Sequence, residues 1–171
     1  MKGVKIVLGI VSALIVIFFL TGLVISEVKY TTEVEINKPI NEVFADFENV
    51  ELMKQWMPEV KSIQVLEEKP GKVGSTYKIE VDNQGRLITM TEKVLAYEVN
   101  KRISFHFDAE NMLKTDDYVF TSNGNNTKIV QESICTSDSY IMRCLFPYFK
   151  GELKRISQTY LDAFKKASEA Q

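Results

Sequence analysis

The chain has 171 residues, with 23 acidic against 21 basic side chains and a formal net charge of −2. Lys2 and Lys5 are the only charged residues before Glu27, so the rest of the chain is acidic, at about −4. An acidic chain without a basic stripe excludes nucleic acid as a partner. One His and two Cys, at positions 135 and 144, make no metal-ligand pattern, so no metal and no cofactor is predicted.

The first feature along the chain is an uncharged run over residues 6–25. At about 1.5 Å per residue, a helix of this length crosses a hydrocarbon core of about 30 Å. A cleaved signal peptide has a shorter apolar region of about 7–15 residues, and a buried helix of a soluble protein has a polar face. We therefore predict an uncleaved transmembrane anchor over residues 1–27, followed by one domain over residues 28–171.

The two lysines at the start set the expected orientation of this anchor. Lys2 and Lys5 precede the apolar run, whereas acidic residues follow it. Positive charge stays on the cytoplasmic side of a membrane. The predicted protein is therefore single-pass, with a cytoplasmic N-terminus and an extracytoplasmic domain.

The domain is expected to open with a strand that leads directly into a helix. Residues 28–36 alternate in the manner of a strand. Pro39 suits the first turn of a helix that reaches about Phe47. Asn49 is a typical N-cap for a second short helix, over residues 50–55, and Pro58 ends it.

Six further strands and one long helix are predicted next. The strands cover residues 61–67, 76–81, 86–97, 102–109, 115–121 and 127–135, with short turns between them that are typical of an antiparallel meander. Pro147 can start the final helix. Its apolar stripe comprises Phe149, Leu153, Ile156, Tyr160, Phe164 and Ala167 and is expected to lie on the concave face of the sheet.

These segments also resemble a known superfamily. The stretch "VEINKPINEVFADFENVELMKQWMPEV", with Pro39, Phe44 and Trp56-Met57-Pro58, is similar to the opening of the SRPBCC superfamily, also called the START or birch-pollen-allergen-like helix-grip fold. The stretches "GKVGSTYKIEV", "EKVLAYEVNKRISFHF" and "YVFTSNGNNTKIV" resemble its glycine turn, kinked strand and paired strands. The resemblance covers residues 30–167 and implies an α+β fold in which a curved antiparallel sheet wraps around the C-terminal helix.

The resemblance implies a container, and three functions remain open. The first is binding or transport of an apolar small molecule or lipid, the second a cyclase- or dehydrase-like enzyme with the same cavity, and the third a protein-interaction module with a filled core. The oxygenase members need an iron site that one His cannot provide. No sequence feature identifies a protein partner.

Alternation and the helix stripe together predict which residues line the cavity. Phe105, Phe107, Tyr118 and Phe120 share one face of adjacent strands, which the final helix must cover. The predicted lining is Trp56, Tyr77, Met90, Phe105, Phe107, Tyr118, Phe120, Leu153, Ile156, Tyr160 and Phe164. For the last strand, Ile129 and Cys135 compete with Val130 and Ile134 for the inner face.

No catalytic residue is predicted. His106 lies opposite Phe105 and Phe107 and is expected to face solvent, out of reach of a substrate. Glu92 alternates with Met90 and could point inward, where burial would raise its pKa, or outward as an ordinary surface carboxylate. Glu132 leaves the same alternatives. Cys135 and Cys144 are interpreted as free, partly buried thiols, with a disulfide between them as the alternative if the domain lies outside the cytoplasm.

Overall fold

The computed structural model describes residues 2–171 and contains four helices and seven strands. The helices are α1 (Lys2–Val24), α2 (Ile40–Glu48), α3 (Val50–Trp56) and α4 (Tyr140–Glu169). The strands are β1 (Val28–Ile36), β2 (Val60–Glu67), β3 (Thr76–Asn83), β4 (Arg86–Glu98), β5 (Arg102–Ala109), β6 (Met112–Asn123) and β7 (Asn126–Thr136). The predicted order and type of the elements are confirmed.

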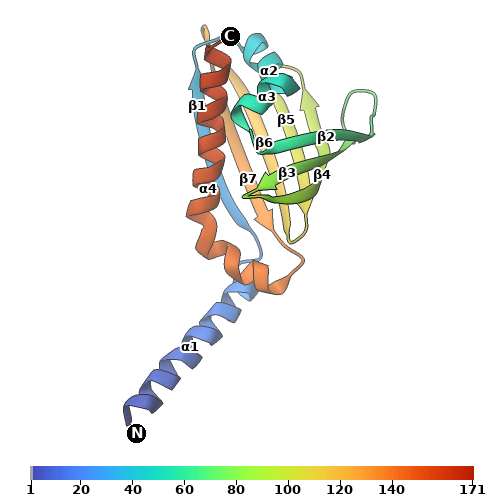
Figure 1. The fold of residues 1–171 in the computed structure, drawn as a ribbon. Coiled ribbons are helices and arrows are strands. Elements are labelled where there is room, and N and C mark those ends of the chain that lie inside the picture. Colours follow the sequence, from blue (N-terminus) through green and yellow to red (C-terminus); the bar gives the residue numbers. More distant parts are fainter. Residues whose placement is uncertain (1) are drawn as a thin grey trace.

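The seven strands form one antiparallel sheet in the order β1-β7-β6-β5-β4-β3-β2. Five hairpin-joined pairs follow chain order from β2 to β7, and β1 then pairs with β7 as an edge strand. Figure 1 shows the sheet curving, so that β2 and β3 stand away from α4. Such curvature follows from the right-handed twist that antiparallel strands accumulate.

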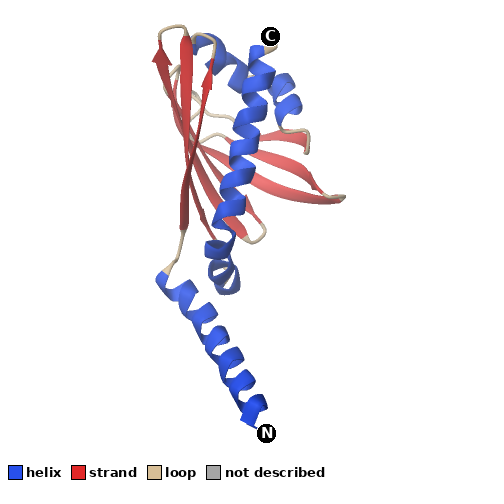
Figure 2. Ribbon diagram, turned by 90° about the vertical axis from the view of Figure 1, so that its left-hand side faces the viewer, coloured by secondary structure: helices blue, strands red, loops and turns tan. Residues whose placement is uncertain are grey.

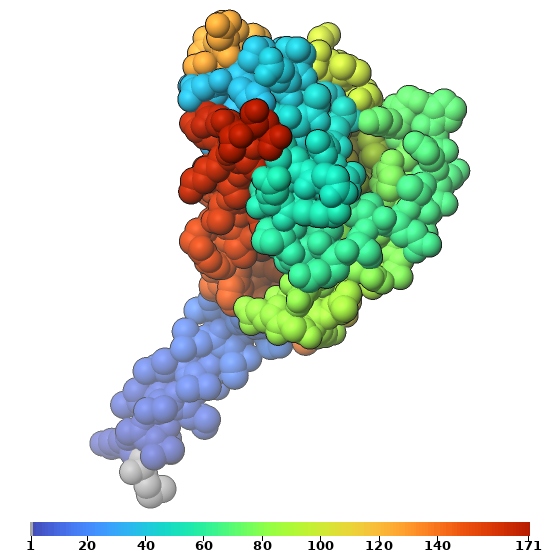
Figure 3. All heavy atoms as spheres, turned by 45° about the horizontal axis from the view of Figure 1, so that its top comes forward, coloured from blue at the N-terminus to red at the C-terminus, as the bar shows by residue number. Residues whose placement is uncertain are grey.

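The long helix α4 lies over one edge of the sheet rather than over its middle. Its partners in the sheet are chiefly β1 and, to a smaller extent, β7, and at its C-terminal end it also packs against α3 and α2 (Figures 1 and 2). In Figure 3, α2 and α3 close directly against the C-terminal part of α4. One end of the domain is therefore covered by three helices, and the other end by α4 alone.

The covered end holds an aromatic core. Phe47 lies at its centre, with ring centroids 5.7 Å from Trp56, 5.4 Å from Phe120 and 5.3 Å from Phe164. Phe44 adds an edge-on contact with Phe120 at 5.0 Å. These edge-to-face and stacked arrangements are favourable for aromatic rings, and all five side chains are buried. This part of the interior is filled by protein.

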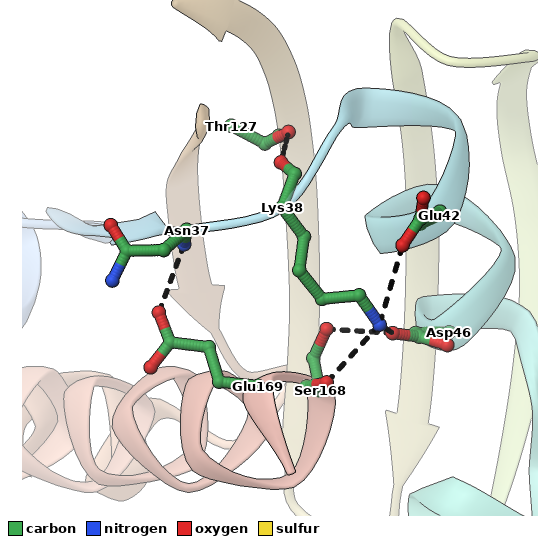
Figure 4. Close-up of polar contacts among 7 residues, drawn as sticks. All are labelled: Asn37, Lys38, Glu42, Asp46, Thr127, Ser168 and Glu169. Carbon is green, nitrogen blue, oxygen red and sulfur yellow. Dashed lines mark hydrogen bonds and ion pairs between the residues drawn. The ribbon is translucent and has the colours of Figure 1, made fainter. Parts of the chain in front are cut away.

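An ion pair and hydrogen bonds connect the β1–α2 junction to the C-terminal end of α4 (Figure 4). The Lys38 ammonium lies 2.9 Å from Asp46 Oδ2 and donates to the Ser168 carbonyl at 3.2 Å. The Ser168 hydroxyl donates to the same Asp46 carboxylate at 2.7 Å. A cation is favourable at a helix C-terminus, where unpaired carbonyls carry partial negative charge. Lys38 therefore anchors α2 and α4 to each other at the closed end.

The start of α4 differs from the sequence prediction. The helix begins at Tyr140, two turns before the predicted start, and Pro147 lies inside it. Figures 1 and 2 show that the N-terminal part of α4 bends away from the rest of the helix, and a proline inside a helix favours such a bend because it removes a backbone donor. The turns before Pro147 are stabilised by contacts with α1. Sequence periodicity cannot predict such contacts between distant segments.

The buried stripe of α4 is also shifted relative to the prediction. The buried residues of α4 are Cys144, against α1, and Phe146, Ser157, Leu161, Phe164, Ala167 and Ser168. Phe149 is 53% exposed and Ile156 is 39% exposed, so these two predicted members lie outside the interface. A polar residue, Ser157, takes the inner position because buried hydroxyl and ammonium groups of the sheet need a partner there.

The first helix extends away from the domain. Among residues 2–171, α1 is the one helix long and apolar enough to span a membrane, and only 6% of its apolar window is buried. Only its C-terminal end meets the domain, beside the start of α4 (Figures 1 and 2).

Candidate functional site

The inner face of the sheet is only partly covered. Because α4 lies over β1 and β7, inner side chains of β3 to β6 keep some access to solvent. The half-buried residues on this face include Tyr77, Met90, Phe105, Phe107 and Tyr118. Phe105 lies 6.0 Å from Phe107 and 6.2 Å from Tyr118 between ring centroids. The structure thus brings five of the predicted lining residues onto one apolar surface.

The other predicted lining residues have different surroundings. Trp56, Phe120 and Phe164 belong to the filled aromatic core, against which Phe105 and Tyr118 also pack. Leu153 packs against a second cluster that contains Val28, Tyr30, Cys135 and Phe146. Tyr160 is half-buried, and its hydroxyl donates to Glu59. Ile156, one helical turn before Tyr160, is partly exposed.

A buried ion pair lies next to this surface, on the inner face of β6. The Lys114 ammonium is 2.8 Å from Asp116 Oδ2, and the two side chains are 18% and 4% exposed. Ser133 Oγ donates to Asp116 Oδ1 at 2.6 Å. Burial lowers the pKa of Lys114, but the Asp116 carboxylate together with Tyr30 and Cys135 more than offsets this effect, and the pKa of Lys114 ends above its usual value.

Hydroxyl and amide groups extend the ion pair into a network under α4. Lys114 reaches Ser157 Oγ at 3.4 Å, and Ser157 Oγ lies 3.1 Å from the Tyr30 hydroxyl. On the other side, Gln131 Nε2 donates to Ser133 Oγ at 3.2 Å. These side chains satisfy one another, which is the condition for a stable buried polar network.

Two polar groups on the inner face have no such partner. Within the described chain, neither the Glu92 carboxyl nor the Tyr118 hydroxyl makes a side-chain hydrogen bond or an ion pair. Glu92 lies opposite Tyr77 on β3 and Phe107 on β5. Burial raises the pKa of Glu92 to about 7 and also raises the pKa of Tyr118. Both groups are therefore available to hydrogen-bond a ligand.

The remaining chemical candidates lie elsewhere. His106 is on the outer face, with Nδ1 3.1 Å from Thr115 Oγ1, and Glu132 is exposed there. Cys135 and Cys144 are free, buried thiols, and on β7 Ile129 and Cys135 take the inner face. Within residues 2–171, no group of three or more His, Cys, Asp and Glu side chains is placed to hold a metal ion.

A hollow of about 680 Å³ is present on the outer face of the sheet. Its lining includes Arg102, Ser104, Thr115, Asp117 and Glu132. Arg102 and Asp117 already pair with each other at 2.8 Å, and the lining contains no cluster of aromatic side chains. The inner face combines apolar surface with unpaired polar groups, so it is the stronger candidate site.

Sequence analysis missed the ion pair and its network, although a signal was present. Alternation in the predicted strand 115–121 places Tyr118 and Phe120 on the inner face and assigns Asp116 to the same face. Lys114 lies just before that predicted strand and joins this face because β6 begins at Met112. Charged side chains are usually exposed on the surface of a protein, which argues against an inward ion pair. Alternation was the better guide here, because each charge has a partner inside.

A curved antiparallel sheet with two short helices, a long C-terminal helix and a partly open inner face defines a helix-grip, ligand-binding class of domain. The chain belongs to the family described as "Polyketide cyclase / dehydrase and lipid transport", which matches residues 27–169. The predicted membership of the SRPBCC superfamily and the predicted fold are thereby confirmed. No curated protein sequence matches the chain.

Solved structures share the fold at low sequence identity. A Thermus thermophilus protein, TTHA0849, is 16% identical with a TM-score of 0.67, covering 83% of this chain and 97% of its own. The Zhui aromatase/cyclase from a Streptomyces species is 15% identical with a TM-score of 0.67, covering 84% and 94%. A START superfamily protein from Mycobacterium smegmatis is 16% identical with a TM-score of 0.63, covering 84% and 95%. At these identities the likeness establishes the fold alone.

Proposed function

We propose that the domain binds an apolar or amphipathic small molecule, such as a lipid, on the inner face of β3 to β6. The observation that carries this proposal is the half-buried aromatic surface of Phe105, Phe107 and Tyr118 beside the unpaired Glu92 carboxyl. An apolar lining with a few polar groups is how ligand sites hold and orient small molecules. A completely filled interior would instead favour an interaction module.

The proposal includes the membrane. Residues 1–27 anchor the chain, the N-terminus is cytoplasmic, and residues 28–171 lie outside the cytoplasm. Support comes from the length and apolarity of α1 and from the two lysines before it. Tethering beside a bilayer raises the effective concentration of a ligand that partitions into that bilayer.

Enlarging one inner residue tests the proposed site. Met90→Trp is expected to weaken binding of a fluorescent fatty acid at least tenfold, because the indole would occupy the uncovered surface next to Glu92. Thr91→Trp is the matched control, since Thr91 is the next residue of β4 and is exposed on the opposite face. The measurement is a fluorescence titration of the full-length protein in detergent micelles.

Two results would count against the site. Equal loss of binding in both variants would show that the ligand does not bind specifically on the inner face. Absence of binding in the wild-type protein, for fatty acids and for sterol or isoprenoid probes alike, would favour a domain that binds no apolar ligand.

An enzyme of the cyclase or dehydrase type is the second candidate. The observation in its favour is Glu92, because a carboxyl with a pKa near 7 can both donate and accept a proton at neutral pH. Tyr118 supplies a second, neutral hydrogen-bond donor. Turnover of a polyketone that is abolished by Glu92→Gln would assign this activity, and binding without turnover would leave the first candidate.

The raised pKa of Glu92 also predicts how stability depends on pH. The folded state holds the Glu92 proton more tightly than the unfolded chain, so the free energy of unfolding should fall as pH rises from about 4.5 to about 7. The loss relative to Glu92→Gln is expected to reach about 3 kcal/mol and to stay constant above that window. Denaturant titrations across pH 4–9 measure it, with Glu132→Gln as an exposed control that should follow the wild type.

A further inference from the structure

The first turns of α4, residues 140–149, meet α1 through one side. The Tyr140 hydroxyl donates to the Phe19 carbonyl, and the two rings stack at 6.2 Å. Tyr148 stacks on Phe18 at 6.3 Å, and its hydroxyl lies 2.9 Å from Thr21 Oγ1. This contact is built from side chains spaced along both helices, so it fixes the position of α4 relative to α1.

Between these aromatic contacts the two helices approach closely. A Cβ atom on Gly22 would lie 2.4 Å from Cys144 Sγ, a distance that no real side chain tolerates. Glycine at this position therefore permits the approach, as small residues do at packed helix pairs. Tyr140, Cys144 and Tyr148 recur every fourth residue and make up the side that faces α1.

A second side of the same turns faces the domain, and a third is largely exposed to solvent. Met142 and Phe146 pack with the cluster around Val28 and Tyr30. Ile141 and Phe149, on the remaining side, are 58% and 53% exposed. Tyr148 is 60% exposed at the margin of this side. These large apolar side chains lie together at the end of the domain next to α1, called here the base of the domain. Exposed apolar side chains that gather in this way mark an interaction surface.

The contacts with α1 determine the depth at which this surface lies. If residues 6–25 span the hydrocarbon core, Gly22 is about 5 Å and Phe18 about 10 Å from its outer edge, at about 1.5 Å per residue. Tyr140, Cys144 and Tyr148 touch this stretch, so they share its depth. Figures 1 and 2 show the start of α4 beside the C-terminal end of α1, and both segments carry exposed apolar side chains.

Arg143 adds a charge on a side chain long enough to extend from this depth to the lipid headgroups. In the described residues its guanidinium has no carboxylate partner, and its buried Nε has no hydrogen-bond partner. The guanidinium instead lies 5.6 Å from the ring centroid of Tyr140. A phosphodiester is a natural partner for a guanidinium, and aromatic residues with arginine are typical of the region between headgroups and acyl chains.

We propose that residues 140–149 form an interfacial helix embedded in the same bilayer leaflet through which α1 leaves the membrane. Ile141 and Phe149 contact the acyl-chain boundary, and Arg143 contacts lipid phosphate. This inference rests on the proposed span of α1 and not on the proposed ligand. It places the base of the domain on the lipid surface and the end closed by α2 and α3 away from it.

Quenching by brominated lipid tests this placement. Phe149→Trp, in the full-length protein reconstituted into phosphatidylcholine vesicles, is expected to lose at least half of its added emission when the acyl chains carry bromine. Leu20→Trp on α1 is the control for the span, and Thr159→Trp, exposed ten residues further along α4, is the control outside the membrane. The native Trp56 is buried in the aromatic core and supplies a constant background.

Each of the other possible quenching results would contradict the interfacial helix. Quenching at position 20 without quenching at 149 would overturn the interfacial helix and leave the anchor intact. If emission at 149 is shifted to the blue yet unquenched, a second copy of the chain covers this surface instead. Quenching at neither position would show that α1 is not in the bilayer, and the inference would fall with the anchor. Quenching at 159 as strong as at 149 would show that α4 lies in the membrane along its length, which contradicts an embedded start alone.

Discussion

Asp116→Ala is expected to lower the free energy of unfolding by about 3–5 kcal/mol, because it leaves the Lys114 ammonium buried and unpaired. Ser133 would also lose the acceptor of its 2.6 Å hydrogen bond. Asp117→Ala is the matched control: Asp117 is the next residue of β6, faces outward and pairs with the exposed Arg102. An exposed pair of this kind contributes at most about 1 kcal/mol.

Denaturant unfolding of the full-length protein in detergent micelles, followed by Trp56 fluorescence, measures both variants. The double variant Lys114→Met, Asp116→Leu should recover most of the stability, because an apolar pair removes the unpaired charge. If Asp116→Ala cost no more than Asp117→Ala, water would have to reach the Lys114 ammonium in solution, and the network under α4 would not be closed.

Replacing Leu14 and Val16 by Arg is expected to abolish stable membrane insertion. Each arginine at the centre of a spanning helix costs about 2.5–3.5 kcal/mol on insertion scales, so the pair outweighs the gain from much of the apolar run. The wild-type chain should stay in the membrane during alkaline carbonate extraction, whereas the variant should be released. Leu14→Ile with Val16→Leu is the apolar control and should behave as the wild type does.

The orientation is tested separately. A protease added to spheroplasts should digest the domain of the wild-type protein while the N-terminal segment stays protected. A domain that is protected in intact spheroplasts and digested only after lysis would place residues 28–171 in the cytoplasm and contradict the two-lysine argument.

The sequence by itself determined the order of elements and most strand faces. Strand alternation placed Phe105, Phe107 and Tyr118 on one inner face, because the side-chain period of two is a property of the extended backbone. Pro39 and Asn49 located the starts of α2 and α3, since fixed φ and a capping side chain act within one turn. The resemblance to the SRPBCC superfamily rests on the same kind of local sequence feature.

Only the tertiary structure decided which partners pack against each face of the strands and of α4. The lateral position of α4 over β1 and β7 leaves Tyr77 and Met90 uncovered while Phe120 and Phe164 are packed. Contacts with α1 carry α4 back beyond Pro147 to Tyr140, against the local preference of proline. The Lys114–Asp116 pair is tolerated inside because Ser133 and Ser157, from distant segments, complete its hydrogen bonds. Local periodicity cannot report partners that are brought together only when the sheet curves around the helix.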